Sequence, residues 1–129
     1  MADQVKNFIK RTVNGGHDDA AVTVSVNNAS LFPDPASGEY NVIWYDATNY
    51  PDPSDDPNVE IVRVTGRDTG ANTVTVTRAQ EDTAASTKNT AGATYKLLLA
   101  PTEKTIADIY AAIAAAGGGG DPLVIQVFS

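Results

Sequence analysis

The sequence predicts a mainly β domain, a small antiparallel β-barrel or sandwich, followed by a C-terminal helix and a tethered strand. Short runs that alternate apolar and polar residues recur between Val22 and Leu99, and a period of two is typical of half-buried strands. Polar turns rich in Gly, Pro, Asn and Asp separate these runs. A chain of 129 residues supports one domain with short appendages.

The composition argues against several classes of function. The chain has no cysteine, so it can form neither disulfides nor thiolate metal sites and has no cysteine nucleophile. Its net charge of −7 argues against direct binding of nucleic acid, because phosphates require clustered basic residues. No apolar run approaches the ~20 residues of a membrane span, and the N-terminus lacks a signal-peptide core. We expect a soluble protein with no membrane partner and no cofactor.

Residues 1–16 are predicted to form a short amphipathic helix or an ordered arm. Val5, Phe8 and Ile9 have helical spacing, and Asn14-Gly15-Gly16 would end such a helix. The segment would either cap the open end of the β core or dock on a partner.

Residues 17–100 are predicted to form the β module. The expected strands are AVTVSV (21–26), YNVIWYD (40–46), EIVRVTG (60–66), NTVTVTRA (72–79) and ATYKLLLA (93–100). The third and fourth would pair as a hairpin, with Val62 and Val64 pointing inward. Phe32 would plug the end of the barrel, with Pro33 stiffening the loop beside it. Trp44, the single tryptophan, belongs either in the core or in an exposed contact.

Residues 101–129 combine a helix, a tether and a strand. Ile106, Ile109, Tyr110 and Ile113 form one apolar stripe, which predicts a helix over 101–116. The four glycines at 117–120 end it and reach about 14 Å when extended. Residues 121–129 are apolar on nearly both faces, and such a strand should not stay exposed. We expect it to pair with a neighbouring copy, to fold back on its own sheet, or to remain disordered.

Self-association is therefore the strongest expectation from the residues themselves. The residues expected at partner contacts are Leu123, Val124, Ile125, Val127 and Phe128 of the terminal strand, Ile106, Ile109 and Ile113 of the helix, and Phe8 and Ile9 of the N-terminal segment.

No motif predicts catalysis, and one loop is a candidate for a metal. His17, the single histidine, lies between a Gly-Gly pair and two aspartates, where polar surface is the simplest interpretation. Asp52, Asp55 and Asp56 in PDPSDDP supply the oxygen ligands that Ca²⁺ accepts, but their spacing matches no EF-hand. A solvated loop tip is the alternative. We expect no enzyme.

Several runs of the β module together resemble a known family. ASLFP, GEY, EIVRVTG, NTVTVTRAQEDTAA and AGATYKLLL occur in the order and spacing of a small β module of tailed-bacteriophage virion proteins. In that family a Phe-Pro loop precedes a strand reading EIIRVT, then TLTVTRGQEGTTAA, and then AGATV before a final strand. The likeness covers most of the span from Val22 to Leu99.

The resemblance implies roles for several residues. Phe32 and Pro33 would be scaffold positions, and Arg78 and Glu81 would anchor the long loop after the hairpin by hydrogen bonds. Further scaffold segments implied by the resemblance are Glu60–Thr65, Thr73–Glu81 and Ala91–Thr94.

The chain departs from the family pattern at two places. The family usually has glycine where this chain has Ala79 and Asp82, so we expect a differently shaped turn after Arg78. The chain also inserts residues 47–58 where the family has a short turn, which makes this insertion the candidate for a protein-specific contact surface.

The resemblance implies a structural function in a virion that is assembled in the host cytoplasm. We expect a tail or baseplate protein that attaches tail fibres or other appendages, as a homo-oligomer (a trimer or hexamer) in contact with other virion proteins. A small capsid decoration protein is the alternative. An alternative of another class is a carbohydrate-binding module, in which Trp44, Tyr45 and Tyr50 would form an exposed platform beside the acidic loop.

Overall fold

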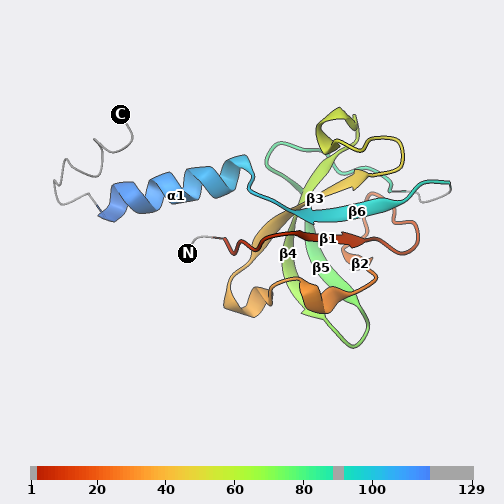
Figure 1. The fold of residues 1–129 in the computed structure, drawn as a ribbon, viewed down its shortest axis with the longest axis horizontal. Helices are drawn as coiled ribbons and strands as arrows, with labels where there is room; N and C mark the ends of the chain where they lie inside the picture. Colours follow the sequence, from red (N-terminus) through yellow and green to blue (C-terminus); the bar gives the residue numbers. More distant parts are fainter. Residues whose placement is uncertain (1–2, 89–91, 117–129) are drawn as a thin grey trace.

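The computed structural model describes residues 3–88 and 92–116 of the chain. Within these residues, six strands form one antiparallel sheet in the order β1-β6-β3-β4-β5-β2, which confirms the mainly β prediction. Figure 1 shows the sheet curled on itself and one helix leading away from it. The strands are β1 (Ile9–Thr12), β2 (Thr23–Ser25), β3 (Tyr40–Asp46), β4 (Glu60–Asp68), β5 (Thr73–Gln80) and β6 (Tyr95–Leu99); the helix is α1 (Glu103–Ala116). Three short 3-10 helices, η1 (Ala29–Leu31), η2 (Pro35–Ser37) and η3 (Pro53–Asp55), lie in the connections.

The sheet curls until its two edge strands meet. Val13, directly after β1, pairs with Val26, directly after β2. The Asn14 N–H donates to the Ser25 carbonyl at 2.8 Å beside this bridge. Register shifts between β4 and β5 mark bulges, which bend and twist a sheet. The architecture is therefore a curled half-barrel built from one sheet, and the sandwich alternative is wrong.

Alternate strand residues fill the inside of the half-barrel. Val62 and Val64 point inward as predicted, and Trp44 is buried, so its core interpretation is confirmed. Phe32 is buried at the barrel end, where its ring stacks on Tyr40 with centroids 6.5 Å apart. The predicted hairpin forms between β4 and β5. The rest of the core cluster consists of Ile9, Val13, Val24, Val26, Ala29, Val42, Val74, Val76, Leu97 and Leu99.

The helix alternative for the N-terminal segment is wrong. Ile9–Thr12 forms β1, which pairs with β6 along its length. Ile9 belongs to the core and is therefore also wrong as a partner contact. Phe8 is fully exposed, because its φ of 62° turns the chain between the arm and the strand. Three apolar residues within five positions have helical spacing by coincidence, and cross-strand pairing decides their structure.

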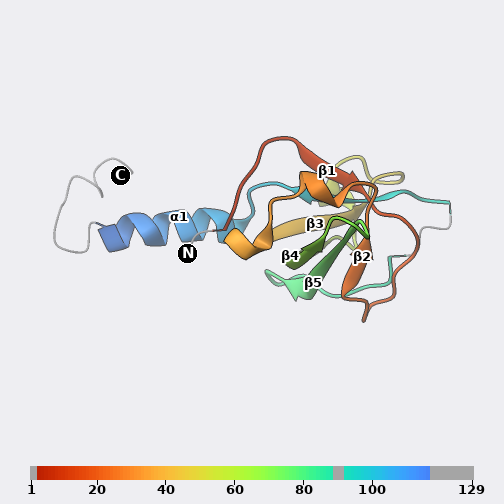
Figure 2. The same ribbon diagram turned by 90° about the horizontal axis from the view of Figure 1, so that it is seen from below.

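The C-terminal helix is confirmed, with α1 beginning two residues after Pro101. Figure 2 shows that it projects from the half-barrel instead of lying on it. Of its residues, all of which the structure describes, Thr105 alone is buried. The predicted tether at 117–120 and the predicted strand at 121–129, with its proposed contacts from Leu123 to Phe128, lie outside the described residues.

Candidate functional site

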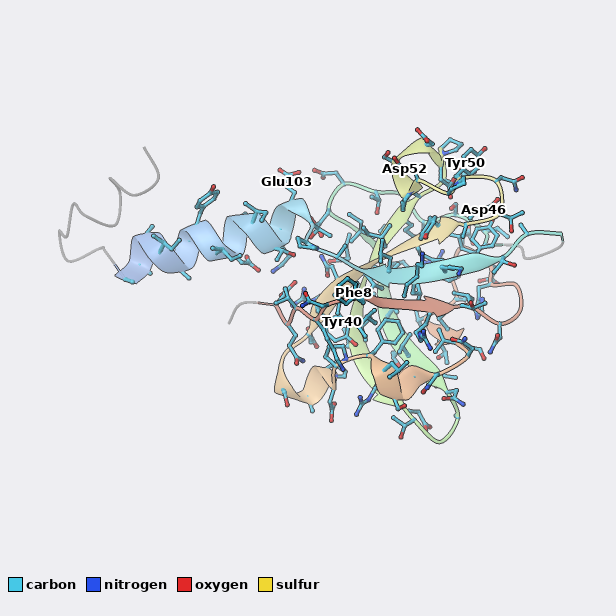
Figure 3. The ribbon with its side chains drawn as sticks, viewed as in Figure 1. Phe8, Tyr40, Asp46, Tyr50, Asp52 and Glu103 are labelled. Carbon is cyan, nitrogen blue, oxygen red and sulfur yellow. The ribbon has the colours of Figure 1, made fainter. Side chains whose placement is uncertain are left out.

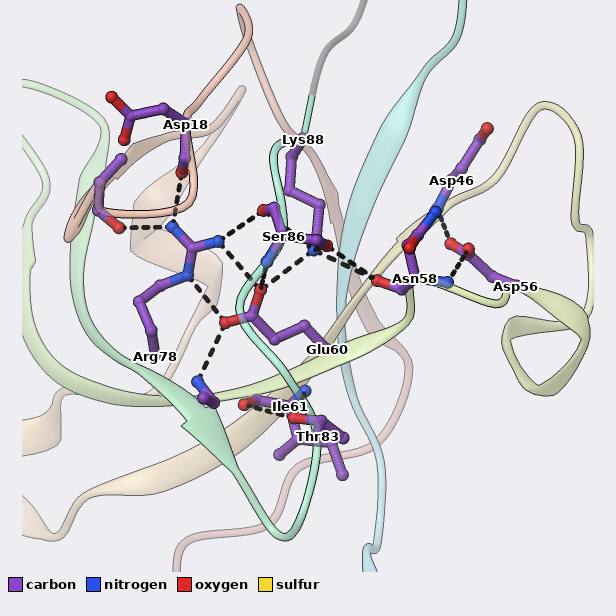
Figure 4. A network of polar contacts seen from close by, with 12 residues as sticks. Asp18, Asp46, Asp56, Asn58, Glu60, Ile61, Arg78, Thr83, Ser86 and Lys88 are labelled. Atoms are coloured by element: carbon purple, nitrogen blue, oxygen red, sulfur yellow. Dashed lines mark hydrogen bonds and ion pairs between the residues drawn. The ribbon is translucent and has the colours of Figure 1, made fainter.

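One possible site is a cluster of charged side chains centred on Glu60 at the start of β4. Its carboxylate is completely buried. It accepts hydrogen bonds from Arg78 Nε at 2.8 Å, Arg78 Nη2 at 2.9 Å and Lys88 Nζ at 3.0 Å (Figure 4). The Ala79 N–H donates to the same carboxylate at 3.0 Å. The neighbouring cations also lie on the Trp44 ring, with Arg78 Cζ 4.9 Å from its centroid.

The cluster ties distant loops to the sheet. Arg78 donates to the backbone carbonyls of Asp18 at 2.7 Å, Ala21 at 2.8 Å and Ser86 at 2.8 Å. Lys88 donates to the Asn58 carbonyl at 3.2 Å and to the Ser86 hydroxyl. Arg78 thus holds the loop that follows β5, as the resemblance implies.

The electrostatics of the cluster suit a structural lock. Burial raises the pKa of the Glu60 carboxyl, but hydrogen bonds from Arg78, the Ala79 N–H and Lys88 outweigh it and lower that pKa to about 2. Burial lowers the pKa of Lys88, and its bond to Glu60 opposes this effect. His17 packs edge-on against Trp44 with centroids 5.5 Å apart, and burial lowers the pKa of its imidazole. The charged groups of this cluster are therefore paired with one another.

The acidic loop does not assemble the calcium site that its composition allows. Asp52 accepts the Ser54 N–H at 3.0 Å and so caps η3, while Asp56 is buried and accepts the Asp46 N–H at 2.9 Å. Asp55 lies within η3 and is exposed. Among residues 3–88 and 92–116, no group of three or more His, Cys, Asp or Glu side chains is placed to hold a metal ion. The carboxylates instead satisfy the backbone of the loop.

The aromatic platform required for the carbohydrate-binding alternative does not form. Trp44 and Tyr45 are both buried, and Tyr50 is half-buried. A sugar-binding platform needs exposed ring faces, so the structural premise of this alternative is wrong.

A different region, where the N-terminal arm (residues 3–8) meets α1, leaves apolar surface uncovered. A groove of about 270 Å³ runs between them and is called here the arm–helix groove. It is lined by Val5, Lys6, Asn7, Leu99, Ala100, Pro101, Thr105, Ile106 and Ile109. Ile106 and Ile109 remain 45% and 46% exposed, and Phe8, directly after the lining residue Asn7, is 99% exposed. Figure 3 shows Phe8 where the arm joins β1.

Polar contacts fix this region to the half-barrel. The Asp3 carboxylate, with its side chain 3% exposed, accepts from Arg63 Nη2 at 3.0 Å and from Lys104 Nζ at 3.2 Å. Lys104 also pairs with Asp108 one helical turn further on. One buried carboxylate therefore joins the arm, strand β4 and helix α1. Burial raises the pKa of Asp3, but these two cationic partners outweigh it and lower that pKa.

Glu81 supports the same helix from the opposite side. Its carboxylate accepts from Asn41 Nδ2 at 2.7 Å and from the Lys104 N–H at 2.7 Å. The second bond satisfies one of the free N–H groups at the start of α1, so Glu81 caps a helix that is distant in the sequence. The resemblance implies that Glu81 anchors a loop, whereas its bonds here also fix the direction in which α1 leaves the barrel.

Sequence reasoning placed Phe8, Ile106 and Ile109 at a partner surface. In the structure Ile106 and Ile109 line the arm–helix groove, and Phe8, which follows the lining residue Asn7, is exposed. Sequence reasoning also has a limit here. It did not find Asp3, Arg63 or Lys104, because charged residues far apart in the chain carry no local signal of pairing. Comparisons with protein-family models and with curated proteins find no match to the chain. In the part of the chain that the structure describes, no helix is both long and apolar enough to cross a membrane.

Proposed function

We propose that the chain is a non-enzymatic structural component of a tailed-phage virion. We assign it to the tail or baseplate, where it would attach fibres or other appendages through oligomeric packing. The observation that carries the proposal is the projecting helix α1, whose apolar side chains Ile106 and Ile109 remain 45% and 46% exposed in the described part of the chain. A barrel whose buried charges at Glu60 are paired, joined to a helix with half-exposed apolar side chains, suits an assembly component better than a catalyst.

Helix α1 favours a homo-oligomer. It has 14 residues, and isolated helices shorter than ~12–15 residues are marginal in water, so packing must supply much of its stability. Ile106, Ile109 and Ile113 follow the 3-4 spacing of a heptad seam, and isoleucine at both seam positions favours three or four strands over two. This argument supports the trimer, or a hexamer made from trimers, over a monomer.

The turn after Arg78 supports the resemblance to phage modules. The family has glycine at two positions where this chain has Ala79 and Asp82. Both residues have positive φ here, 55° for Ala79 and 64° for Asp82. Glycine is the residue that adopts this backbone without strain, so the family's glycines fall where this backbone requires them. The turn therefore has a backbone conformation that glycine adopts without strain, which supports the resemblance.

Quantitative mass spectrometry of purified particles of the encoding phage tests the proposal. We expect the chain at three or six copies per particle and in the tail fraction after the particles are split into heads and tails. Hundreds of copies in the head fraction would favour the capsid decoration alternative. Absence from purified particles would overturn the virion function altogether.

The terminal strand has a separate test. Deleting residues 121–129 should lower the oligomer mass measured by light scattering. The deletion removes Leu123, Ile125 and Phe128, through which we expect the terminal strand to pair with a neighbouring copy. Unchanged mass would exclude strand exchange between copies but would leave packing through α1 in place.

A further inference from the structure

Phe8 is held in a conformation that its side chain disfavours. Its φ is 62°, a left-handed value that is an outlier for a bulky residue, and its side chain is 99% exposed. Among residues 3–88 and 92–116, no burial of the ring compensates this strain. Strained residues persist only where their surroundings determine them, and they occur often at contact sites.

The surroundings of Phe8 do determine its position. On one side Asp3 is tied to Arg63 and Lys104, and Gln4 Nε2 donates to the carbonyl of Asp34 at 2.8 Å. On the other side Ile9 is buried in the core as the first residue of β1. The intervening arm cannot relax without breaking one of these anchors. The ring is therefore presented outward in a fixed place, which reduces the entropy lost on binding.

The arm–helix groove is lined by Asn7, the residue directly before Phe8 in the chain. Its volume of about 270 Å³ is at the lower limit of small-ligand pockets, typically ~300–1,000 Å³, and suits a single large apolar side chain. Of the described residues that line it, only Lys6 is charged. In a chain with a net charge of −7, this is a place where two copies can approach without bringing acidic side chains together.

We propose that Phe8 of one copy inserts into the arm–helix groove of a neighbouring copy. This inference rests on the homo-oligomer of the proposed function and names its copy-to-copy contact. In a trimer such a contact is heterologous, and repeated around the three-fold axis it closes a ring of copies.

Disulfide trapping tests the pairing directly, since the chain has no cysteine of its own. F8C and I109C chains are mixed in equal amounts, at a concentration where the unsubstituted chain is oligomeric, and are then oxidised. We expect the 8–109 heterodimer to form faster than the 8–8 and 109–109 homodimers. A mixture of V22C and I109C is the matched control, because Val22 is 50% exposed but lies next to β2. Predominant 8–8 dimers, or no excess over the control, would overturn the proposal.

A second variant separates the ring from the backbone. Phe8→Asn keeps a residue that tolerates the left-handed conformation and removes the apolar ring. We expect association about 10- to 100-fold weaker by sedimentation, with unchanged melting of the monomer, and no such loss for Val22→Asn. Native association of Phe8→Asn would contradict the proposal even if the chain is found in virions. Conversely, an 8–109 cross-link in a chain absent from virions would uphold this contact while the virion function fails.

Discussion

The Glu60 cluster and the arm–helix region both combine charged and apolar side chains. They differ in how much of that surface the fold itself buries or pairs. Around Glu60 the carboxylate and its two cations are buried and bonded to one another and to backbone carbonyls. In the arm–helix region the anchor Asp3 is buried, while Phe8 is 99% and Ile106 45% exposed. The first region stabilises the fold, and the second holds apolar surface that the described residues leave exposed.

The largest expected effect comes from breaking the Glu60 cluster. Glu60→Gln leaves Lys88 and Arg78 as buried cations without their counter-charge, which costs about 3–5 kcal/mol for a buried pair. Urea denaturation measures this loss as a decrease in the free energy of unfolding. The matched control is Glu39→Gln, which removes the 45% exposed partner of Arg63 and should cost less than about 1 kcal/mol. Equal losses for the two variants would mean that the cluster is not the stabilising region.

Acid should weaken the Glu60 region in two steps. The pKa of His17 is lowered from 6.5 in the folded chain, so below that pH the unfolded chain binds a proton that the folded chain does not bind. The free energy of unfolding therefore falls as the pH drops below 6.5. The pKa of Glu60 is about 2 in the folded chain against 4.5 when unperturbed, so its contribution is present above pH 4.5 and is lost between pH 4.5 and 2. That second loss amounts to about 3 kcal/mol. Asp3 and Glu81, whose pKa values are also lowered, add to it.

The free energy of unfolding measured at a series of pH values between 8 and 3 resolves these steps. His17→Gln should remove the decrease below pH 6.5 and keep the lower one. A decrease of the same size in His17→Gln would show that another group titrates in this range.

The arm–helix region should respond in association and not in monomer stability. Replacing Ile106 and Ile109 by serine keeps a similar helix propensity and removes exposed apolar surface. We expect the unfolding free energy of the monomer to change by less than about 0.5 kcal/mol, because surface substitutions have small effects. The oligomer mass by light scattering should fall. A large loss of monomer stability would show that the helix packs on its own barrel instead of on another copy.

The smallest effect is expected at the turn after Arg78. The left-handed backbone at Ala79 costs alanine about 1–2 kcal/mol, and Ala79→Gly removes this strain. Against this, glycine loses about 0.5–1 kcal/mol more conformational entropy on folding than alanine does. The net result is a stabilisation of about 0.5–1 kcal/mol, visible as a higher melting temperature. Ala36→Gly is the control, since Ala36 is an exposed residue outside the positive-φ group, and it should destabilise by a similar amount. Destabilisation by Ala79→Gly would contradict the strain argument.

Much of the fold follows from patterns between neighbours in the sequence. The alternation around Val62 and Val64 predicts strand β4 with its inward face, and the isoleucine stripe predicts α1. These patterns are reliable because they extend over several turns or pleats and depend only on local periodicity. The three apolar residues at Val5, Phe8 and Ile9 form too short a pattern, and pairing with β6 decided their structure.

Ion pairs between residues far apart in the chain leave no such local pattern in the sequence. Lys88 stands in a polar stretch that predicts a solvated loop, yet its ammonium group is buried against Glu60, 28 positions earlier in the chain. Likewise Asp3 is near the N-terminus and pairs with Lys104 at the start of the helix. A buried charge is stable only beside its partner, and only the folded chain brings the two together.

Local patterns were thus enough to predict a β module followed by a helix with an apolar stripe, because hydrophobic periodicity is a local property that each segment carries alone. The tertiary structure decided which side chains are buried and which remain exposed. Closure of the half-barrel buried Glu60, Trp44 and Ile9, and the anchors at Asp3 held Phe8 outward. Whether a side chain is available to a partner depends on every element around it, so exposure is a property of the whole fold.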